Sequence, residues 1–222
     1  MTRSAYARLE GVLAEARRRS LVGNLPFATQ RAHSEGFMRA LSLEPFSGRV
    51  LELGAGGGLP GLVLAIEDQD LRLVLLDSAR RSVSFLQWAV AELDLESRVE
   101  VVNARAEQLG REEQYRGSFA AVIARSFGRP AVTAECAAPL LQVGGRLVVS
   151  EPPPGSSLAG AVEEHTLPAP DRWPAEGCAQ LGLIPELELR DEFGFAVLRQ
   201  ASPCPDRYPR RPGIPAKRPL FS

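Results

Sequence analysis

The chain has 222 residues, of which 45% are hydrophobic, and a formal net charge of −1 at pH 7. This size and composition suit one globular unit with a sizeable core. The near-zero charge excludes a chain that is basic throughout, so an anionic partner would need a local basic patch. Cys136, Cys178 and Cys204 are widely spaced and odd in number. They disfavour a disulfide framework or a metal site and favour a reducing compartment.

The N-terminal region predicts two helices. Residues 2–20 combine five arginines with an apolar stripe and lack the apolar core of a secretory signal, a pattern typical of an amphipathic helix. A second helix is expected at about 29–42, after the helix breakers Gly23 and Pro26. No apolar run reaches the ~20 residues that span a bilayer. We expect a cytoplasmic protein that has no membrane contact, with residues 1–46 as a helical extension.

Short apolar runs then alternate with segments of helical length. The expected strands are 49–53, 71–76, 99–102, 119–124, 146–150, 184–190 and 194–199, and the expected helices are about 60–68, 80–94, 130–142 and 175–182. Such alternation is typical of a parallel sheet covered by helices on both faces. The tight connection at 192–194 predicts an antiparallel hairpin at the sheet edge. The fold class is therefore α/β, a doubly wound, mostly parallel seven-stranded sheet over residues 47–202.

The last segment, residues 203–222, is rich in proline and carries five basic residues with no acid after Asp206. We interpret it as an extended basic arm.

The most informative segment is the glycine-rich run from Val50 to Gly61, which follows a strand and opens a helix. Its glycines, Gly54, Gly56 and Gly58 among them, allow a ligand to approach the backbone closely. In open α/β sheets, ligands bind beyond the carboxyl ends of the strands. Asp77 ends the next strand, about 20 residues later, where a carboxylate can accept hydrogen bonds from both ribose hydroxyls of an adenosine-type ligand.

Three interpretations of this loop remain open. Gly56, Gly58 and Gly61 satisfy the G-x-G-x-x-G pattern of dinucleotide enzymes. Glu52 stands just before the first glycine, where it would repel a phosphate but can face an ammonium or sulfonium group. We therefore favour S-adenosyl-L-methionine over a dinucleotide. The third interpretation is a tight turn that binds nothing.

With these features the chain resembles the bacterial small-subunit (16S) ribosomal RNA guanine-N7 methyltransferases, also called glucose-inhibited division protein B. The resemblance implies a class I, Rossmann-like methyltransferase that uses S-adenosyl-L-methionine and acts in rRNA processing. The matching segments are the G-x-G-x-G-[LF]-P-G loop and its helix at 54–66, residues 75–78, the helix with Arg81, Phe85 and Leu86, residues 103–107, 124–126 and 139–145, and the tail at 208–220.

The resemblance also implies roles for single residues. Gly54 and Leu59 would line the cofactor, and Ala106 and Glu107 would meet its adenine end. Arg125 would grip the methionine carboxylate, because a guanidinium binds a carboxylate through two parallel hydrogen bonds.

The substrate of such an enzyme would be ribosomal RNA or the small ribosomal subunit. Arg210, Arg211, Lys217 and Arg218 are the candidate phosphate contacts, and Phe127 is a candidate for stacking on the target base. Guanine N7 has an in-plane lone pair and needs no deprotonation, so we expect no catalytic acid or base. We expect a monomer.

Two segments depart from the family pattern. Members carry R-H-x-x-D-S near the N-terminus, whereas residues 32–37 keep only His33. Members have a lysine and a glycine after the fifth strand, whereas this chain has Ser150-Glu151-Pro152. Both departures lie outside the cofactor residues. They leave open a methyltransferase that acts on a small molecule or a protein, and a non-catalytic relative that binds nucleic acid.

Overall fold

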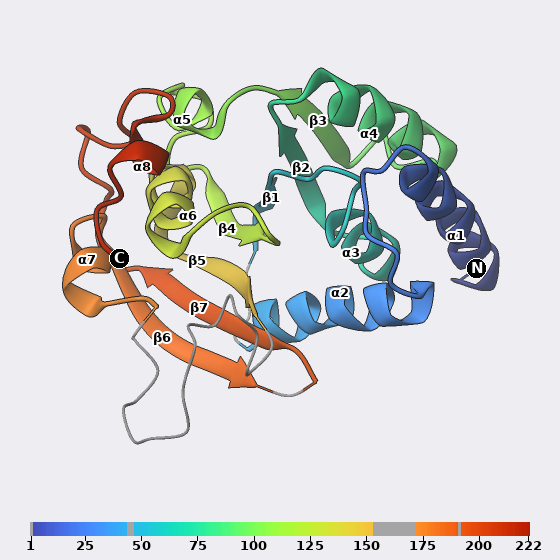
Figure 1. The fold of residues 1–222 in the computed structure, drawn as a ribbon, viewed down its shortest axis with the longest axis horizontal. Helices are drawn as coiled ribbons and strands as arrows, with labels where there is room; N and C mark the ends of the chain where they lie inside the picture. Colours follow the sequence, from blue (N-terminus) through green and yellow to red (C-terminus); the bar gives the residue numbers. More distant parts are fainter. Residues whose placement is uncertain (1, 44–46, 153–171, 191) are drawn as a thin grey trace.

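The computed structural model describes residues 2–43, 47–152, 172–190 and 192–222. Its centre is a seven-stranded sheet in the order β3-β2-β1-β4-β5-β7-β6 (Figure 1). The strands are β1 (Arg49–Leu53), β2 (Arg72–Asp77), β3 (Val99–Asn103), β4 (Phe119–Ala124), β5 (Leu141–Glu151), β6 (Leu183–Arg190) and β7 (Gly194–Gln200). The first five are parallel, and β7 runs antiparallel to both β5 and β6. This confirms the expected fold class and its terminal hairpin.

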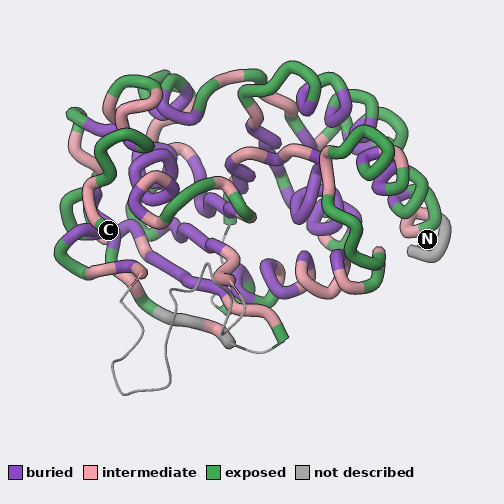
Figure 2. The backbone as a smooth tube through the Cα atoms, viewed as in Figure 1, coloured by how far each residue is buried: buried purple, intermediate pink, exposed green. Residues whose placement is uncertain are grey.

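Helices cover both faces of the sheet because alternate strand residues enter two separate apolar clusters. Val50 and Leu73 belong to the cluster beneath α1 to α4, and Leu51 and Val74 belong to the cluster beneath α5 to α8. Buried positions accordingly follow the strands and the inward sides of the helices (Figure 2). The helices are α1 (Thr2–Arg18), α2 (Phe27–Leu41), α3 (Gly61–Glu67), α4 (Arg80–Glu92), α5 (Ala106–Leu109), α6 (Pro130–Ala137), α7 (Ala175–Ala179) and α8 (Ile214–Lys217).

The N-terminal helices share the core of the sheet. Leu9 and Leu13 of α1, and Phe37 of α2, are buried in the same cluster as the residues of α3 and α4. Residues 21 and 22, in the link between the first two helices, lie against Gly57. The predicted helical extension therefore packs directly behind the glycine-rich loop.

One predicted helix ends early. The segment expected to be helical to about residue 142 stops at Ala137, continues as a short 3-10 turn (Ala138–Leu140), and passes into β5 at Leu141. Pro139 lacks the backbone N–H that a helix interior needs. A register shift between Phe119 and Ala121 of β4 accommodates the early start of the strand.

The expectation of an extended C-terminal arm is wrong. Residues 203–222 fold back over α5, α6 and α7 (Figure 1). The Arg116 guanidinium donates to the carbonyl oxygens of Cys204 and Tyr208, both at 2.9 Å. Phe221 fills the space where Gly177 lacks a side chain, and Tyr208 is buried. Apolar and aromatic residues between the basic ones give this tail a packed inner side.

None of the helices in the described ranges is both long enough and apolar enough to cross a membrane.

Candidate functional site

The glycine-rich loop lies at the carboxyl edge of the sheet, the edge at which the parallel strands end. Gly54 and Gly56 follow β1 with φ angles of 66° and 54°, a backbone conformation that residues with a Cβ seldom adopt. Gly54 is also confined by packing, because a Cβ there would lie 2.8 Å from the ring of Phe127. The positive φ angles at both positions, and the packing of Phe127 against Gly54, are met by glycine and by few other residues.

Asp77 stands beside the glycines, as the spacing predicts. Its Oδ2 accepts a hydrogen bond from the Gly56 N–H at 2.9 Å, and its Oδ1 accepts one from the Ala79 N–H at 2.8 Å. A carboxylate has about four lone-pair positions, so both oxygens keep capacity for a ligand hydroxyl. The carboxylate therefore has the position and the free acceptors that a ribose site requires.

Glu52 lies beneath the loop. Its Oε2 accepts a hydrogen bond from the Gly61 N–H at 2.9 Å, at the start of α3, and the residue is 1% exposed. Burial raises the pKa of Glu52 to about 8, with the Gly61 hydrogen bond and the Arg125 charge acting in the opposite direction. The hydrogen bond from Gly61 to Glu52 thus links β1 to the start of α3.

Replacing Glu52 by glutamine is expected to remove a pH dependence of stability. Folding raises the pKa of Glu52 from 4.5 to about 8, so the folded state holds this proton more tightly than the unfolded chain does. Its contribution to stability is full below pH 4.5 and is lost as the pH rises towards the folded pKa, at up to about 1.4 kcal/mol per pH unit. Urea unfolding of both proteins across this interval measures the slope. Parallel profiles would contradict a buried carboxyl group here.

Arg125 follows β4 and is a partly buried cation. Its Nη1 atom is buried and has no hydrogen-bond partner within the described ranges. Burial lowers the pKa of Arg125, and Glu52 opposes that effect. An unsatisfied buried donor on a charged group costs several kcal/mol unless an acceptor arrives. An anionic ligand group would supply the acceptor that this guanidinium lacks among the described residues.

His33 of α2 lies in the electrostatic field of Arg125. Burial, assisted by the Arg125 charge, lowers the pKa of His33 to about 4, so the imidazole is neutral near pH 7. Its ring lies 4.8 Å from that of Phe193 and 5.5 Å from that of Phe195. Sequence reasoning singled out His33 but missed the two phenylalanines, which are about 160 residues away and become neighbours only through the C-terminal hairpin.

Ala106 and Glu107 begin α5 at the end of β3. The Glu107 carboxylate accepts hydrogen bonds from the Gly213 N–H at 2.9 Å and from Arg105 Nη2 at 3.2 Å. Burial tends to raise the pKa of Glu107, but these hydrogen bonds outweigh it and hold the pKa below its usual value. The side chain expected at the adenine end thus anchors the C-terminal tail, a contact that no local sequence pattern predicts.

The basic tail residues fall into two groups. Arg210 forms an ion pair with the fully buried Glu135 of α6, with Nε–Oε1 and Nη2–Oε2 distances of 2.8 and 2.5 Å. Arg211, Lys217 and Arg218 are exposed. Arg210 therefore holds the tail against α6, whereas the other three side chains lie at the surface.

Gly58 is buried in the loop, where a Cβ would lie 2.3 Å from the Leu62 side chain of α3. Leu59 is buried within the loop, and Phe127 is half-buried against Gly54. Glu151 forms an ion pair with Arg172 at 2.5 Å and accepts a hydrogen bond from Trp173 Nε1 at 2.7 Å. The acid in this segment is thus paired with a neighbouring cation. Among the residues that the structure describes, no group of three His, Cys, Asp or Glu side chains is placed to hold a metal ion.

The sequence is similar to a family described as rRNA small subunit methyltransferase G, whose model matches residues 37–151. A protein of that name from Rubrobacter xylanophilus is 35% identical over 218 residues, which cover 94% of this chain and 80% of that protein. Another from Thermotoga maritima is 38% identical over 180 residues, which cover 80% of this chain and 71% of the relative.

Solved structures support the fold. Geranyl diphosphate C-methyltransferase from Streptomyces coelicolor, crystallised with S-adenosyl-L-homocysteine, superposes with a TM-score of 0.56 at 14% identity, covering 76% of this chain and 78% of that one. A Klebsiella pneumoniae protein provisionally named an O-methyltransferase gives a TM-score of 0.58 at 14% identity, covering 86% and 89%. At this identity the likeness shows the class I methyltransferase fold.

Proposed function

Because this chain belongs to the rRNA small subunit methyltransferase G family, we propose that the carboxyl edge of its sheet holds S-adenosyl-L-methionine and presents it to a guanine N7 of the small-subunit RNA. The family supplies the enzyme class, the cofactor and the reaction. Residues of this chain would carry out these tasks.

The residues at the edge fit the cofactor. The observation that supports the assignment is the buried Arg125 Nη1, which has no hydrogen-bond acceptor among the described residues and would be satisfied by the amino-acid carboxylate of the cofactor. Asp77, fixed by the Gly56 N–H, would take the ribose hydroxyls. Gly54, Gly58 and Leu59 would line the cofactor, and the start of α5 at Ala106 and Glu107 would border the adenine. Together these residues would hold both ends of an adenosine-bearing amino acid.

The chain's contribution to the reaction is orientation. The cofactor supplies a methyl group that is already activated on a sulfonium. Arg125 and Asp77 would fix its two ends, so that the methyl group is held in line with the N7 lone pair. His33 is neutral, and a neutral ring beside the site adds no repulsion against the positive charge that passes to the guanine. No residue has to remove a proton, since N7 carries none.

The exposed tail cations would meet RNA phosphates. Arg211, Lys217 and Arg218 are displayed on a tail that is anchored to α5 and α6 through Glu107 and Glu135. Fixed cations bind a phosphate backbone with a smaller loss of entropy than cations on a free arm. Affinity from such contacts weakens with salt.

A methyl-transfer assay tests the proposed function. Small ribosomal subunits from a strain that lacks this methylation would be incubated with the protein and tritiated S-adenosyl-L-methionine. We expect label in the RNA fraction that ribonuclease releases and protease does not. Label released only by protease, or no label in RNA, would contradict the proposal.

Replacing Asp77 by alanine is expected to weaken cofactor binding about ten- to hundredfold, the cost of losing hydrogen bonds to a charged acceptor. Titration calorimetry with S-adenosyl-L-homocysteine measures this loss. Asp70→Ala, an exposed acid in the turn before β2, serves as the matched control and should bind as the wild type does. Equal affinity of the Asp77 variant and this control would remove Asp77 from the site.

A further inference from the structure

A small cavity lies beside the proposed methyl-transfer site, between α2 and the C-terminal hairpin. Its volume is about 200 Å³, below the roughly 300–1,000 Å³ of pockets that enclose whole drug-sized ligands. We call it the aromatic pocket. Its lining residues are Gly36, Arg39, Leu43, Leu189, Phe193 and Phe195.

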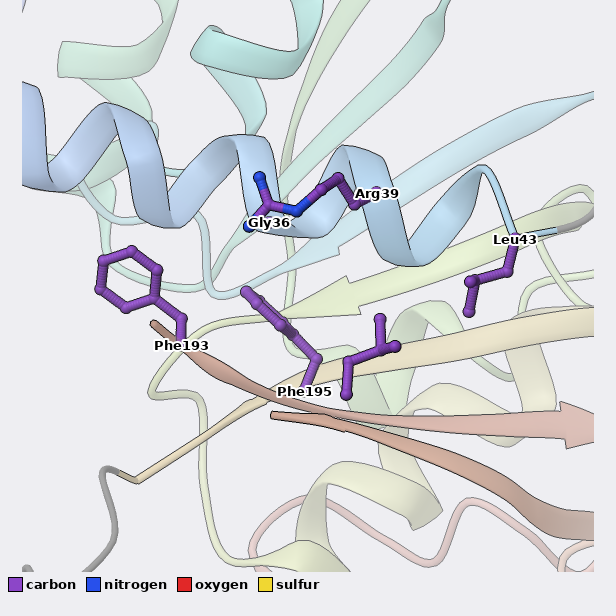
Figure 3. Close-up of a pocket in the computed structure, with 6 residues that line it drawn as sticks. Gly36, Arg39, Leu43, Phe193 and Phe195 are labelled. Carbon is purple, nitrogen blue, oxygen red and sulfur yellow. The ribbon is translucent and has the colours of Figure 1, made fainter. Parts of the chain in front are cut away.

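The aromatic pocket combines flat apolar walls with one cation. Figure 3 shows the Arg39 side chain folded back along α2 towards Gly36, on the side that faces the rings of Phe193 and Phe195. Gly36 makes the close approach of α2 possible, since a Cβ there would lie 2.5 Å from the Phe195 ring. Arg39 is exposed and has no ion pair or hydrogen bond with any described residue. Phe195 is 2% exposed and forms a wall of the pocket, whereas Phe193 is half-buried and keeps part of its ring accessible. An accessible ring next to an unengaged guanidinium suits a nucleotide.

Strand register places this pocket next to the reacting centre. Ala124, the residue before Arg125, pairs with Val149 of β5, and the following residue, Ser150, pairs with Phe195 of β7. Only β5 separates the two strands, so they are about 10 Å apart. His33 of α2 contacts both phenylalanine rings, and the Arg125 charge acts on it.

We propose that the aromatic pocket binds a nucleotide that flanks the target guanine, with its base against Phe193 and its phosphate on Arg39. A base held at the methyl group must leave its stack, and its neighbour in the strand is then unstacked as well. The pocket would replace that lost stacking and fix the strand beside the site. This subsite rests on the proposed function, because it requires an RNA substrate.

Steady-state kinetics of Phe193→Ala and Arg39→Gln test the subsite, with unmethylated small subunits and tritiated S-adenosyl-L-methionine as substrates. Loss of one stacked base should raise the KM for RNA about five- to hundredfold in Phe193→Ala. Arg39→Gln should raise the same KM and reduce the salt dependence of RNA binding by the equivalent of one phosphate contact. Both variants should keep the wild-type Kd for S-adenosyl-L-homocysteine.

The matched control is Arg72→Gln, which removes an exposed arginine at the amino end of β2, on the opposite edge of the sheet. It should have wild-type kinetics. A wild-type KM in both pocket variants would overturn the subsite, and so would a parallel rise in the cofactor Kd, since the change would then act through the cofactor site. If the wild-type protein methylates no RNA, the proposed function itself fails.

Discussion

Replacing Arg125 by methionine is expected to weaken binding of S-adenosyl-L-homocysteine about thirty- to several-thousand-fold, while the protein stays at least as stable. The guanidinium would grip the amino-acid carboxylate through two charge-assisted hydrogen bonds, and truncating one partner of such a buried pair costs 2–5 kcal/mol or more. Without ligand, the same buried Nη1 has no acceptor in the described part of the chain, so its removal should not lower Tm.

Calorimetry and thermal unfolding on the same preparations separate these effects. Arg125→Lys is the companion variant, because it keeps the charge and loses the forked geometry. Its affinity for S-adenosyl-L-homocysteine should fall between those of the wild type and Arg125→Met. If Arg125→Met bound the ligand as tightly as the wild type, the methionine carboxylate would have to lie elsewhere. A fall in Tm together with lost binding would instead indicate that Arg125 supports the fold.

Replacing Arg210 by methionine is expected to destabilise the protein by about 3–5 kcal/mol, the usual cost of leaving a buried charge without its partner. Glu135 is fully buried and takes its hydrogen bonds from the Arg210 backbone N–H and guanidinium. The pair fastens the tail to α6. Urea unfolding measures the loss, and limited proteolysis should show earlier cleavage within residues 203–222.

The double variant Glu135→Leu with Arg210→Met is the control. It removes both charges and should recover most of the lost stability, because an apolar pair of similar volume replaces a buried ion pair at little cost. A loss below about 1 kcal/mol in the single variant would mean that the ion pair behaves as a surface pair. The tail would then be held mainly by Tyr208 and Phe221.

The sequence predicts those parts of the site that depend on the spacing of nearby residues. The glycine loop after β1 and the acid that ends β2 are fixed by strand order, because parallel strands bring their carboxyl ends together. That geometry places Asp77 beside Gly56. The helices before β1 follow equally from the periodicity of their apolar residues, within about two residues at each end.

Contacts between segments that are far apart in the sequence cannot be predicted in this way. The tail looked like a free arm because its prolines and basic residues are typical of one, whereas the buried Glu135 that holds it stands 75 residues earlier. Arg210 belonged to the expected phosphate contacts for the same reason. The aromatic pocket joins residues 36–43 to 189–195, and no local pattern relates these two segments.

The aromatic pocket and the anchored tail lie on opposite faces of the same sheet. Arg125, Glu52 and His33 are electrostatically coupled on the side covered by α1 to α4, next to the aromatic pocket. On the other side, Glu107 links the start of α5 to Gly213 in the tail. The proposed cofactor site would therefore have the aromatic pocket, proposed for the flanking nucleotide, on one side of the sheet and the anchored tail with its exposed cations on the other.

The position of the transferred methyl group tests this account most directly. RNA methylated by the protein would be reduced with borohydride and treated with aniline, which cleaves the strand at N7-methylguanine, and the products mapped by primer extension. We predict cleavage at a guanine of the small-subunit RNA that depends on both the protein and S-adenosyl-L-methionine. Label on an exocyclic amine or a ribose oxygen would contradict the account, because the methyl group would then have been placed on an atom other than the guanine N7.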